Sequence, residues 1–224
     1  MNDGLKIDIG CGSCKKKGYI GVDILDVPGV DHVIDMMKEP LPFPESSVSQ
    51  VFSSHFLEHL DNPGRVFVEL SRVVSDGAEL ELWTPYTWSN SAFIYDHAQF
   101  FNEDHYLHMC VWYCDFWRPI LNSSWQLKEF QYVFDSEALV DLYHHQIDLL
   151  FALKYFKCLV KEFCAHIVVR KSINEPVVTP RKTWSLSRDG EKYAFPFASS
   201  PPMEELDKAL NYYQNQKVKD YGVA

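Results

Sequence analysis

The feature that most constrains the fold is an ordered series of short apolar strands within the first 85 residues. Segments rich in β-branched and aromatic residues, which predict strands, fall at 6–9, 19–24, 33–34, 48–53 and 79–84. Between the last two, apolar residues repeat at helical spacing, with Asn62 as the expected N-cap and Gly77 as the expected C-terminal cap. Strands that alternate with crossovers predict a parallel sheet with helices on both faces.

The rest of the chain completes one domain, and a segment without a periodic pattern and a final helix follow it. An aromatic stretch at 86–125 without a clear period predicts an irregular insertion after the fifth strand. Further strands at 127–134 and 162–169 enclose a helix from 136 to about 159. We therefore expect an α/β domain over residues 1–170, with a doubly wound, mostly parallel, seven-stranded sheet. The sequence predicts a linker or extended arm at 171–200 and a C-terminal helix at 201–224.

Charge and cysteine content restrict the partners. The formal net charge is −10 without a long Lys/Arg block, which argues against nucleic acid or an anionic membrane as partner. A chain of this length with an ordinary core does not need disulfides, so we expect its six cysteines to be reduced and its location to be cytoplasmic. The apolar side of the C-terminal helix suits packing on its own domain or on a second subunit, so a homodimer is an open expectation.

The main functional signal is Asp8-Ile9-Gly10-Cys11-Gly12, directly after the first strand. Glycines there let a ligand approach the backbone closely. Asp23 ends the second strand, where a carboxylate can accept both ribose hydroxyls. Asp35 follows the third strand and can accept from the amine of an adenine, while Met36 offers a soft face to the ring. The carboxyl ends of these strands share one edge of the sheet, which is where open α/β sheets bind ligands.

The spacing favours an adenosyl ligand over a dinucleotide. Ten residues separate Gly12 from Asp23, against about 20 in dinucleotide-binding folds, and a third glycine is missing. So short a crossover leaves little room for the helix N-terminus that a pyrophosphate would require. A nicotinamide dehydrogenase is therefore the alternative cofactor class, and the less favoured one.

In this order the motifs resemble the class I S-adenosylmethionine-dependent methyltransferases, in particular a small branch with a short first crossover. The matching stretches are 8–12, 18–24, 41–44, 53–60 and 97–101. The resemblance implies S-adenosylmethionine as cofactor and S-adenosylhomocysteine as its product. It implies that the cofactor-binding positions are Asp8, Gly10, Cys11, Gly12, Asp23, Ile24, Asp35, Met36, Ser53, Ser54 and His55. The departures are Ser13 and Cys14 in place of the third glycine, and no helix before the first strand.

Three histidines are the candidates for catalysis. Methyl transfer from a sulfonium uses an activated donor, so the protein mainly aligns the reactants, and a base is needed only for a hydroxyl or a protonated amine. His55, at the ligand edge, has a pKa range that suits a base, although it could equally order the loop. His59 suits a structural role better, and His97 in the aromatic insertion could reach an acceptor. Nearby, Tyr86 and Trp88 could line the acceptor pocket.

No metal site is expected from the sequence. A second group of metal-ligating residue types lies in the insertion, but its spacing matches no standard zinc site. These residues are His105, His108, Cys110 and Cys114. The expected function is methyl transfer to a small or medium acceptor such as a sugar, a glycan precursor or another metabolite. The alternatives are a non-catalytic cofactor-binding module of the same fold and a protein or peptide methyltransferase.

Overall fold

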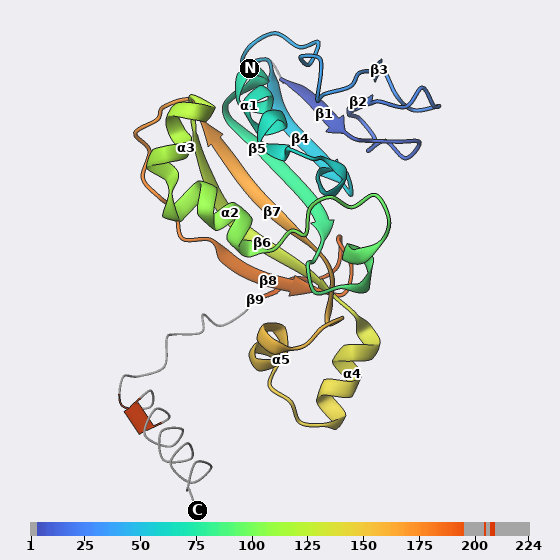
Figure 1. The fold of residues 1–224 in the computed structure, drawn as a ribbon, viewed down its shortest axis with the longest axis vertical. Helices are drawn as coiled ribbons and strands as arrows, with labels where there is room; N and C mark the ends of the chain where they lie inside the picture. The colour runs from blue at the N-terminus through green and yellow to red at the C-terminus, as the bar shows by residue number, and fades with distance from the viewer. Residues whose placement is uncertain (1–3, 195–203, 205–206, 209–224) are drawn as a thin grey trace, which may run out of the picture.

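The computed structural model describes residues 4–194, 204 and 207–208, and it contains one twisted sheet with helices packed on one face (Figure 1). The strands are β1 (Leu5–Ile9), β2 (Ile20–Asp23), β3 (His32–Val33), β4 (Val48–Ser54), β5 (Val74–Pro85), β6 (Ser124–Phe134), β7 (Val160–Arg170), β8 (Arg181–Ser185) and β9 (Tyr193–Ala194). The α-helices are α1 (Pro63–Val73), α2 (Glu103–Leu107), α3 (Cys114–Leu121), α4 (Ser136–His144) and α5 (Leu149–Tyr155). Short helical turns are η1 (Leu57–His59), η2 (Asn90–Phe93) and the π-helical η3 (His108–Trp112).

The strand order is β3-β2-β1-β4-β5-β7-β6-β8-β9. Strands β3 to β5 are parallel, and β7 runs antiparallel to both β5 and β6. The mostly parallel Rossmann-like sheet is confirmed, with nine strands in place of the expected seven. From β1 the chain moves outward through β2 to β3 and then returns to β4 on the other side. The order therefore reverses between β1 and β4, which marks the ligand-binding edge of such a sheet.

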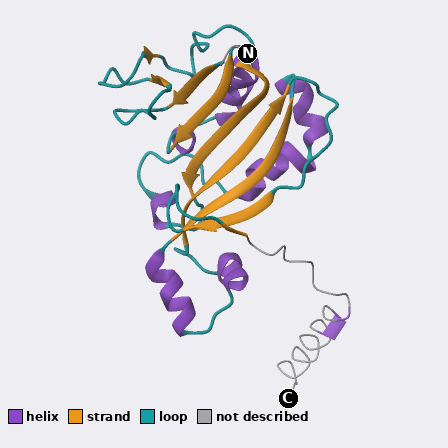
Figure 2. Ribbon diagram, turned by 180° about the vertical axis from the view of Figure 1, so that it is seen from behind, coloured by secondary structure: helices purple, strands orange, loops and turns teal. Residues whose placement is uncertain are grey.

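Among the described residues, the helices cover only one face of the sheet, unlike the expected cover on both faces. Helices α1, α2 and α3 pack on that face, whereas the reverse view shows the strands without helices over them (Figure 2). Strand β5 shows the reason, because Leu80 and Leu82 are buried while Glu79 and Glu81 alternate with them toward the opposite face. A polar cavity of about 380 Å³ lies along that opposite face. The short crossovers before β2 and β3 contain no helix that could cover it.

Helix α1 supplies much of the packing against the sheet. Its buried side includes Phe67 and Leu70, and the Phe67 ring lies 5.4 Å from the ring of Trp125 on β6. Two details differ from the sequence expectation. The Asn62 side chain makes no capping hydrogen bond, and the helix ends at Val73 because the chain passes directly into β5. Gly77 therefore lies within β5 (φ +79°) rather than at the helix cap.

Two other expected segments also differ. The insertion at 86–125 is irregular only in its first half, since residues 103–121 form α2, η3 and α3, with Asn102 capping α2. The single helix expected at 136–159 is two helices, broken where Gln146 adopts a positive φ of 54° and Asp148 caps α5. Both helices lie beyond the end of the sheet (Figure 1).

The segment expected to be a linker or arm contributes two strands to the sheet. Strand β8 pairs parallel with β6, and β9 pairs antiparallel with β8. The buried Glu129 on β6 accepts a hydrogen bond from Thr183 Oγ1 at 2.6 Å and pairs with Arg181, which fixes β8 in place. The expected C-terminal helix at 201–224 falls almost wholly outside the described residues, so dimerisation through it stays a prediction.

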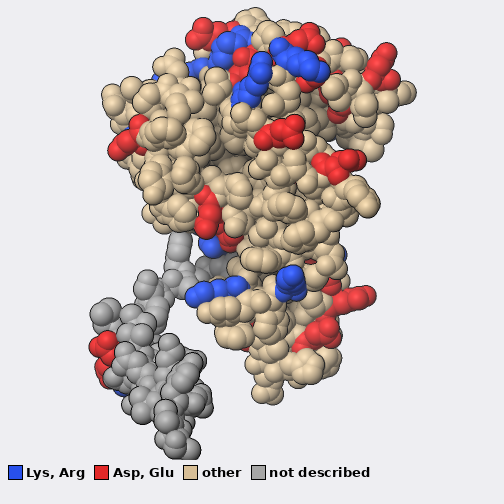
Figure 3. All heavy atoms as spheres, in the orientation of Figure 1, with Lys and Arg blue, Asp and Glu red and all other residues tan. Residues whose placement is uncertain are grey.

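The surface matches the acidic composition. On the face drawn in Figure 3, Lys and Arg lie among Asp and Glu and form no broad basic patch. None of the helices in the described part of the chain has both the length and the apolar character needed to cross a bilayer.

Candidate active site

A cavity of about 630 Å³ lies at the carboxyl edge of β1, β2, β3 and β4. This volume falls within the ordinary range of small-molecule sites. The predicted positions in its wall are Gly10, Gly12, Asp23, Ile24, Asp35, Met36 and His55. Leu25, Ile34, Met37, Phe56, His59, Leu60 and Asp96 complete the lining. The fold thus brings most of the predicted cofactor residues into one pocket.

The two glycines after β1 have different roles. Gly10 has a φ of +67°, and a Cβ built on it would lie 2.2 Å from Cγ of Phe56, so the Phe56 ring covers this part of the loop. Gly12 has a φ of +48°, and a Cβ there would meet nothing within 4 Å. The backbone at Gly12 therefore stays open toward the cavity, as a closely bound ligand requires.

Asp23 ties the loop to the strand edge. Its buried carboxylate accepts from the backbone N–H of Gly12 at 2.8 Å and from that of Leu25 at 2.9 Å. Each carboxylate oxygen can accept a second hydrogen bond, so both remain able to receive a ribose hydroxyl. Beside it, the Ile24 and Leu25 side chains are 59% and 56% exposed and offer an apolar surface within the pocket wall.

Asp35 lies in the same wall after β3. It accepts from the backbone N–H of Met37 at 3.0 Å and pairs with Lys38 at 2.7 Å. The hydrogen bond from Lys38 lowers the pKa of this carboxyl, which is therefore ionised at neutral pH. An ionised carboxylate next to Met36 and Met37 suits the amine edge and the face of an adenine.

Four predicted cofactor residues lie outside the cavity wall. Asp8 is buried and accepts from the backbone N–H of Lys16 at 2.7 Å; burial raises its pKa. Cys11 is buried too, and burial together with the neighbouring carboxylates raises its pKa to about 11. The Ser53 hydroxyl is fully buried, and the Ser54 hydroxyl accepts from Arg188 at 2.8 Å. Direct contact of these four with a cofactor stays a prediction.

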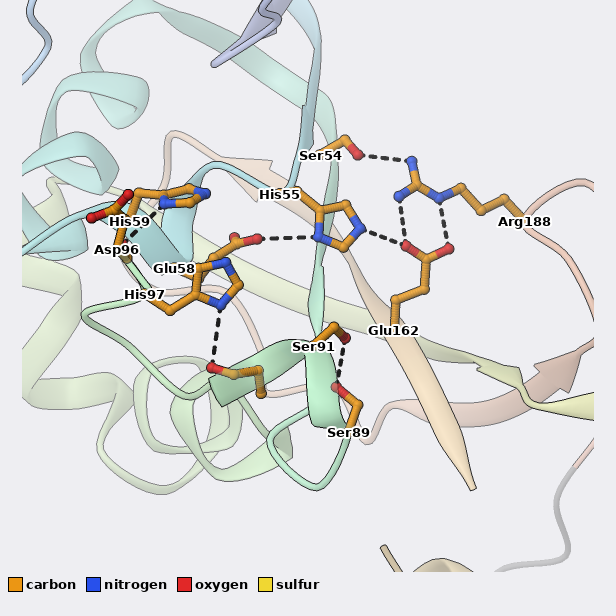
Figure 4. A network of polar contacts seen from close by, with 11 residues as sticks. Ser54, His55, Glu58, His59, Ser89, Ser91, Asp96, His97, Glu162 and Arg188 are labelled. Carbon is orange, nitrogen blue, oxygen red and sulfur yellow. Dashed lines mark hydrogen bonds and ion pairs between the residues drawn. The ribbon is translucent and has the colours of Figure 1, made fainter. Parts of the chain in front are cut away.

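His55 is held between two carboxylates (Figure 4). Its Nδ1 lies 3.2 Å from Glu58 Oε1, and its Nε2 lies 2.8 Å from Glu162 Oε2. The hydrogen bonds to Glu162 and Glu58 raise the pKa of His55 to about 9, so the ring is an imidazolium at neutral pH. A ring that already carries the proton cannot accept another, so this geometry favours a fixed cation. The role of base stays a prediction. The positive φ of 53° at His55 is the kind of backbone strain found at functional sites.

The other two histidines face each other across two loops. The backbone N–H groups of Ala98 and Gln99 donate to the Glu58 carbonyl at 2.7 and 3.0 Å, which fastens the 96–99 loop to η1. As a result the rings of His59 and His97 lie edge to face, with centroids 4.7 Å apart. Both stand near His55 in Figure 4. His59 belongs to the cavity wall, and His97 lies directly behind it.

The two residues proposed to line the acceptor pocket, Tyr86 and Trp88, differ in burial. Tyr86 is buried and donates to Glu103 at 3.1 Å, so it belongs to the core and not to a pocket. Trp88 is 45% exposed. In the rejected zinc group, the His105 side chain accepts from the backbone N–H of Asn102 at the start of α2, and His108 accepts from the indole N–H of Trp117 at 3.1 Å. Those two histidines therefore have structural partners.

Sequence reasoning missed the acidic and basic partners of His55. Glu162 lies at the start of β7 and Arg188 in the supposed linker, so no local pattern links either residue to the site. Glu58 lies three residues after His55 within the 53–60 stretch, and this spacing, which puts two side chains on one face of a helical turn, was the one available signal. Cys11 and Cys14 are also spaced as a CxxC pair, although both thiols are free.

Comparison with known proteins agrees with this fold. Residues 7–82, from β1 to β5, match the family described as a methyltransferase domain. No curated protein is significantly similar to the chain. Similar solved structures include an S-adenosylmethionine-dependent methyltransferase from Archaeoglobus fulgidus, 16% identical, with a TM-score of 0.48 over 74% of this chain and 86% of that one. Another is geranyl diphosphate C-methyltransferase from Streptomyces coelicolor, 14% identical, with a TM-score of 0.47 over 74% of this chain and 72% of that one.

The chain contains a methyltransferase domain whose family match begins in β1 and ends in β5. The strand order and the glycine loop are those expected of an S-adenosylmethionine-dependent methyltransferase fold. The cavity fits this cofactor, since Gly12 leaves open the space that a Cβ would occupy and two carboxylates stand at adjacent strand ends. Asp23 would hold the ribose, Asp35 the adenine amine and the Gly12 backbone the methionine portion. When bound, the cofactor supplies an activated methyl group.

Proposed function

We propose that this methyltransferase acts on a small or medium acceptor, such as a sugar, a glycan precursor or another metabolite. The observation that carries the proposal is the single cavity that combines Gly12, Asp23 and Asp35 with His55 and His59. Its size suits one organic cofactor with room at the histidine end for part of an acceptor.

The surface next to that end is apolar and aromatic. The segment from Phe93 to Phe100 carries exposed side chains, with Tyr95 96% exposed, and Asp96 of this segment lies in the cavity wall. Flat exposed side chains can contact a ring-shaped acceptor and keep its reacting atom aligned with the methyl group. His55, whose two ring N–H groups are held by carboxylates, can then act on an electronegative group of the acceptor only through its charge.

Calorimetric titration tests the cofactor half of the proposal. The parent protein should bind S-adenosylmethionine, and Asp23→Asn should weaken binding about 10- to 100-fold, because charge-assisted hydrogen bonds to the ribose are lost. Asp26→Asn is the matched control, since Asp26 is exposed three positions further on and does not line the cavity. Parent protein that does not bind the cofactor, or equal affinity in Asp23→Asn, would contradict the assignment.

A screen with labelled methyl donor tests the acceptor half. Pools of sugars, sugar derivatives and other metabolites are compared with peptide and protein pools. Label in a small-molecule pool supports the proposal. Label only in the peptide or protein pools would favour the protein methyltransferase alternative. Cofactor binding without transfer to any pool would favour the non-catalytic module.

A further inference from the structure

Glu58, His59 and His97 converge on one point beside the cofactor cavity. The potential ligand atoms of these three side chains all lie within 4.8 Å of one another. Glu58 and His59 come from η1, and His97 comes from the loop that is hydrogen-bonded to the Glu58 carbonyl. The three are therefore brought together by backbone contacts and not by chance proximity of mobile side chains.

In both histidines, Nδ1 already has a backbone carbonyl as its hydrogen-bond partner. Nδ1 of His59 lies 3.0 Å from the Asp96 carbonyl, and Nδ1 of His97 lies 3.2 Å from the Ala92 carbonyl. A carbonyl oxygen can only accept, so in each neutral ring Nδ1 carries the proton and Nε2 keeps its lone pair. This arrangement, in which a backbone carbonyl orients the ring, is the one that metal-binding histidines use.

Glu58 provides an independent observation. Its side chain is 1% exposed, and Oε2 is buried without a hydrogen-bond partner among the described residues. The other oxygen, Oε1, contacts His55. A buried carboxylate oxygen without a donor is unfavourable unless a cation or a donor meets it. The unpaired oxygen therefore points to a positively charged ligand.

We propose that Glu58, His59 and His97 bind a divalent transition-metal ion, with zinc as the first candidate. Two imidazoles and one carboxylate are a donor set used by catalytic zinc sites, which keep a further position for water or substrate. Magnesium and calcium prefer oxygen ligands, so two nitrogens disfavour them. Three protein ligands leave the ion open to a fourth.

The place of the site suggests its use, and this part rests on the proposed function. His59 also lines the cofactor cavity, so the ion would lie at the cavity edge. A hydroxyl of the acceptor bound to the ion would lose its proton to solvent more readily. Its oxygen would then bond to the methyl carbon while the carbon–sulfur bond breaks and its electron pair stays on sulfur. Such an ion would replace a histidine base.

Zinc titration of the full chain, after treatment with a chelator, tests the site. The parent protein should bind one zinc ion per chain, and His59→Ala and His97→Ala should each weaken binding at least 100-fold. His144→Ala is the control, because His144 is exposed on α4 and does not line the cavity. Circular dichroism verifies that each variant is folded. Parent protein without one tight zinc site, or unchanged affinity in both variants, would overturn the proposal.

Two further titrations, with Glu58→Gln and with the cofactor, distinguish failure of the metal site from failure of the proposed function. Glu58→Gln keeps the size of the side chain and removes its charge, so it should also weaken zinc binding strongly; unchanged affinity would remove Glu58 from the site. S-adenosylmethionine titration of the metal-free parent protein is read independently. Cofactor binding without zinc binding would overturn the metal site alone, whereas zinc binding without cofactor binding would overturn the proposed function alone.

Discussion

His55 on the loop after β4 and Glu162 on β7 are 107 residues apart in the sequence, yet Nε2 and Oε2 lie 2.8 Å apart. Glu162 also accepts from Arg188 at 2.9 and 2.6 Å. Burial alone would raise the pKa of Glu162, but the hydrogen bonds from Arg188 and His55 outweigh it and lower the pKa to about 2. This carboxylate therefore joins the loop that carries the site to the antiparallel half of the sheet.

Removing the charge of Glu162 should change the titration of His55. In Glu162→Gln, the pKa of His55 should fall from about 9 toward its ordinary value of 6.5, because the largest favourable contact of the imidazolium is lost. NMR titration of the ring nitrogens, with chelator present, measures this value directly. Glu137→Gln, an exposed change on α4, should leave it unaltered. A pKa of His55 that stays near 9 in Glu162→Gln would show that Glu162 does not hold the charge.

The same pair should shape the dependence of stability on pH. The pKa of Glu162 is lowered in the folded state, so its contribution is present above about 4.5 and is lost as pH falls toward 2. The pKa of His55 is raised, so its contribution is complete below about 6.5 and is lost as pH rises through 9. Between pH 4.5 and 6.5 both contribute, and there Glu162→Gln should lower the free energy of unfolding by about 1–3 kcal/mol.

Denaturant unfolding at a series of pH values measures this difference. The gap between the parent protein and Glu162→Gln should narrow toward both acid and alkaline pH. A gap that is constant across the whole range would mean that the substitution acts through packing and not through charge.

The two glycines of the loop should separate stability from binding. Gly12→Ala places a Cβ into open space, so it should cost only about 1 kcal/mol for the positive φ, while cofactor affinity falls at least tenfold. Gly10→Ala meets the Phe56 ring as well as an unfavourable φ, so it should lower the free energy of unfolding by about 2–4 kcal/mol. Thermal unfolding and cofactor titration of both variants provide the comparison. The reverse ranking in stability would contradict the assigned positions of the two loop glycines.

Local sequence was sufficient for the parallel half of the sheet and for the cofactor edge. Strands β1, β2 and β3 are short runs that end at or near a glycine or a carboxylate, and parallel strands bring such ends together by topology alone. Asp23 and Asp35 therefore meet in the pocket wall as expected. Glu79 and Glu81 alternate with Leu80, a pattern that indicates a sheet with one polar face. This pattern is evidence against the expected helices on both faces.

Contacts between distant segments could not be predicted in this way. The state of His55 depends on Glu162 and Arg188, whose positions follow from the antiparallel return of β7 and from the turn after β8. Neither residue lies in a motif with His55. Likewise, His97 contacts His59 because the backbone amides of Ala98 and Gln99 donate to the Glu58 carbonyl. Such backbone hydrogen bonds do not depend on residue type, so the sequence does not reveal them.

Strand β8, which lies between β6 and β9, offers a test of how such a non-local contact holds a segment. Glu129 is 3% exposed and interacts with Arg181, Thr183 and Lys192, all from the segment that sequence pattern assigned to a linker. Burial would raise the pKa of Glu129, but hydrogen bonds from these three side chains lower it, so the carboxylate is charged at neutral pH. In Glu129→Gln the paired charges lose their partner, and β8 should open more often.

Hydrogen–deuterium exchange should then rise at least tenfold for the amides of residues 181–185. The amides of residues 78–82 on β5 should keep their protection, because β7 and β6 separate that strand from β8. Glu137→Gln again serves as the exposed control. Equal protection of β8 in the parent protein and in Glu129→Gln would show that backbone pairing with β6 alone holds the strand, and that the buried carboxylate contributes nothing to its docking.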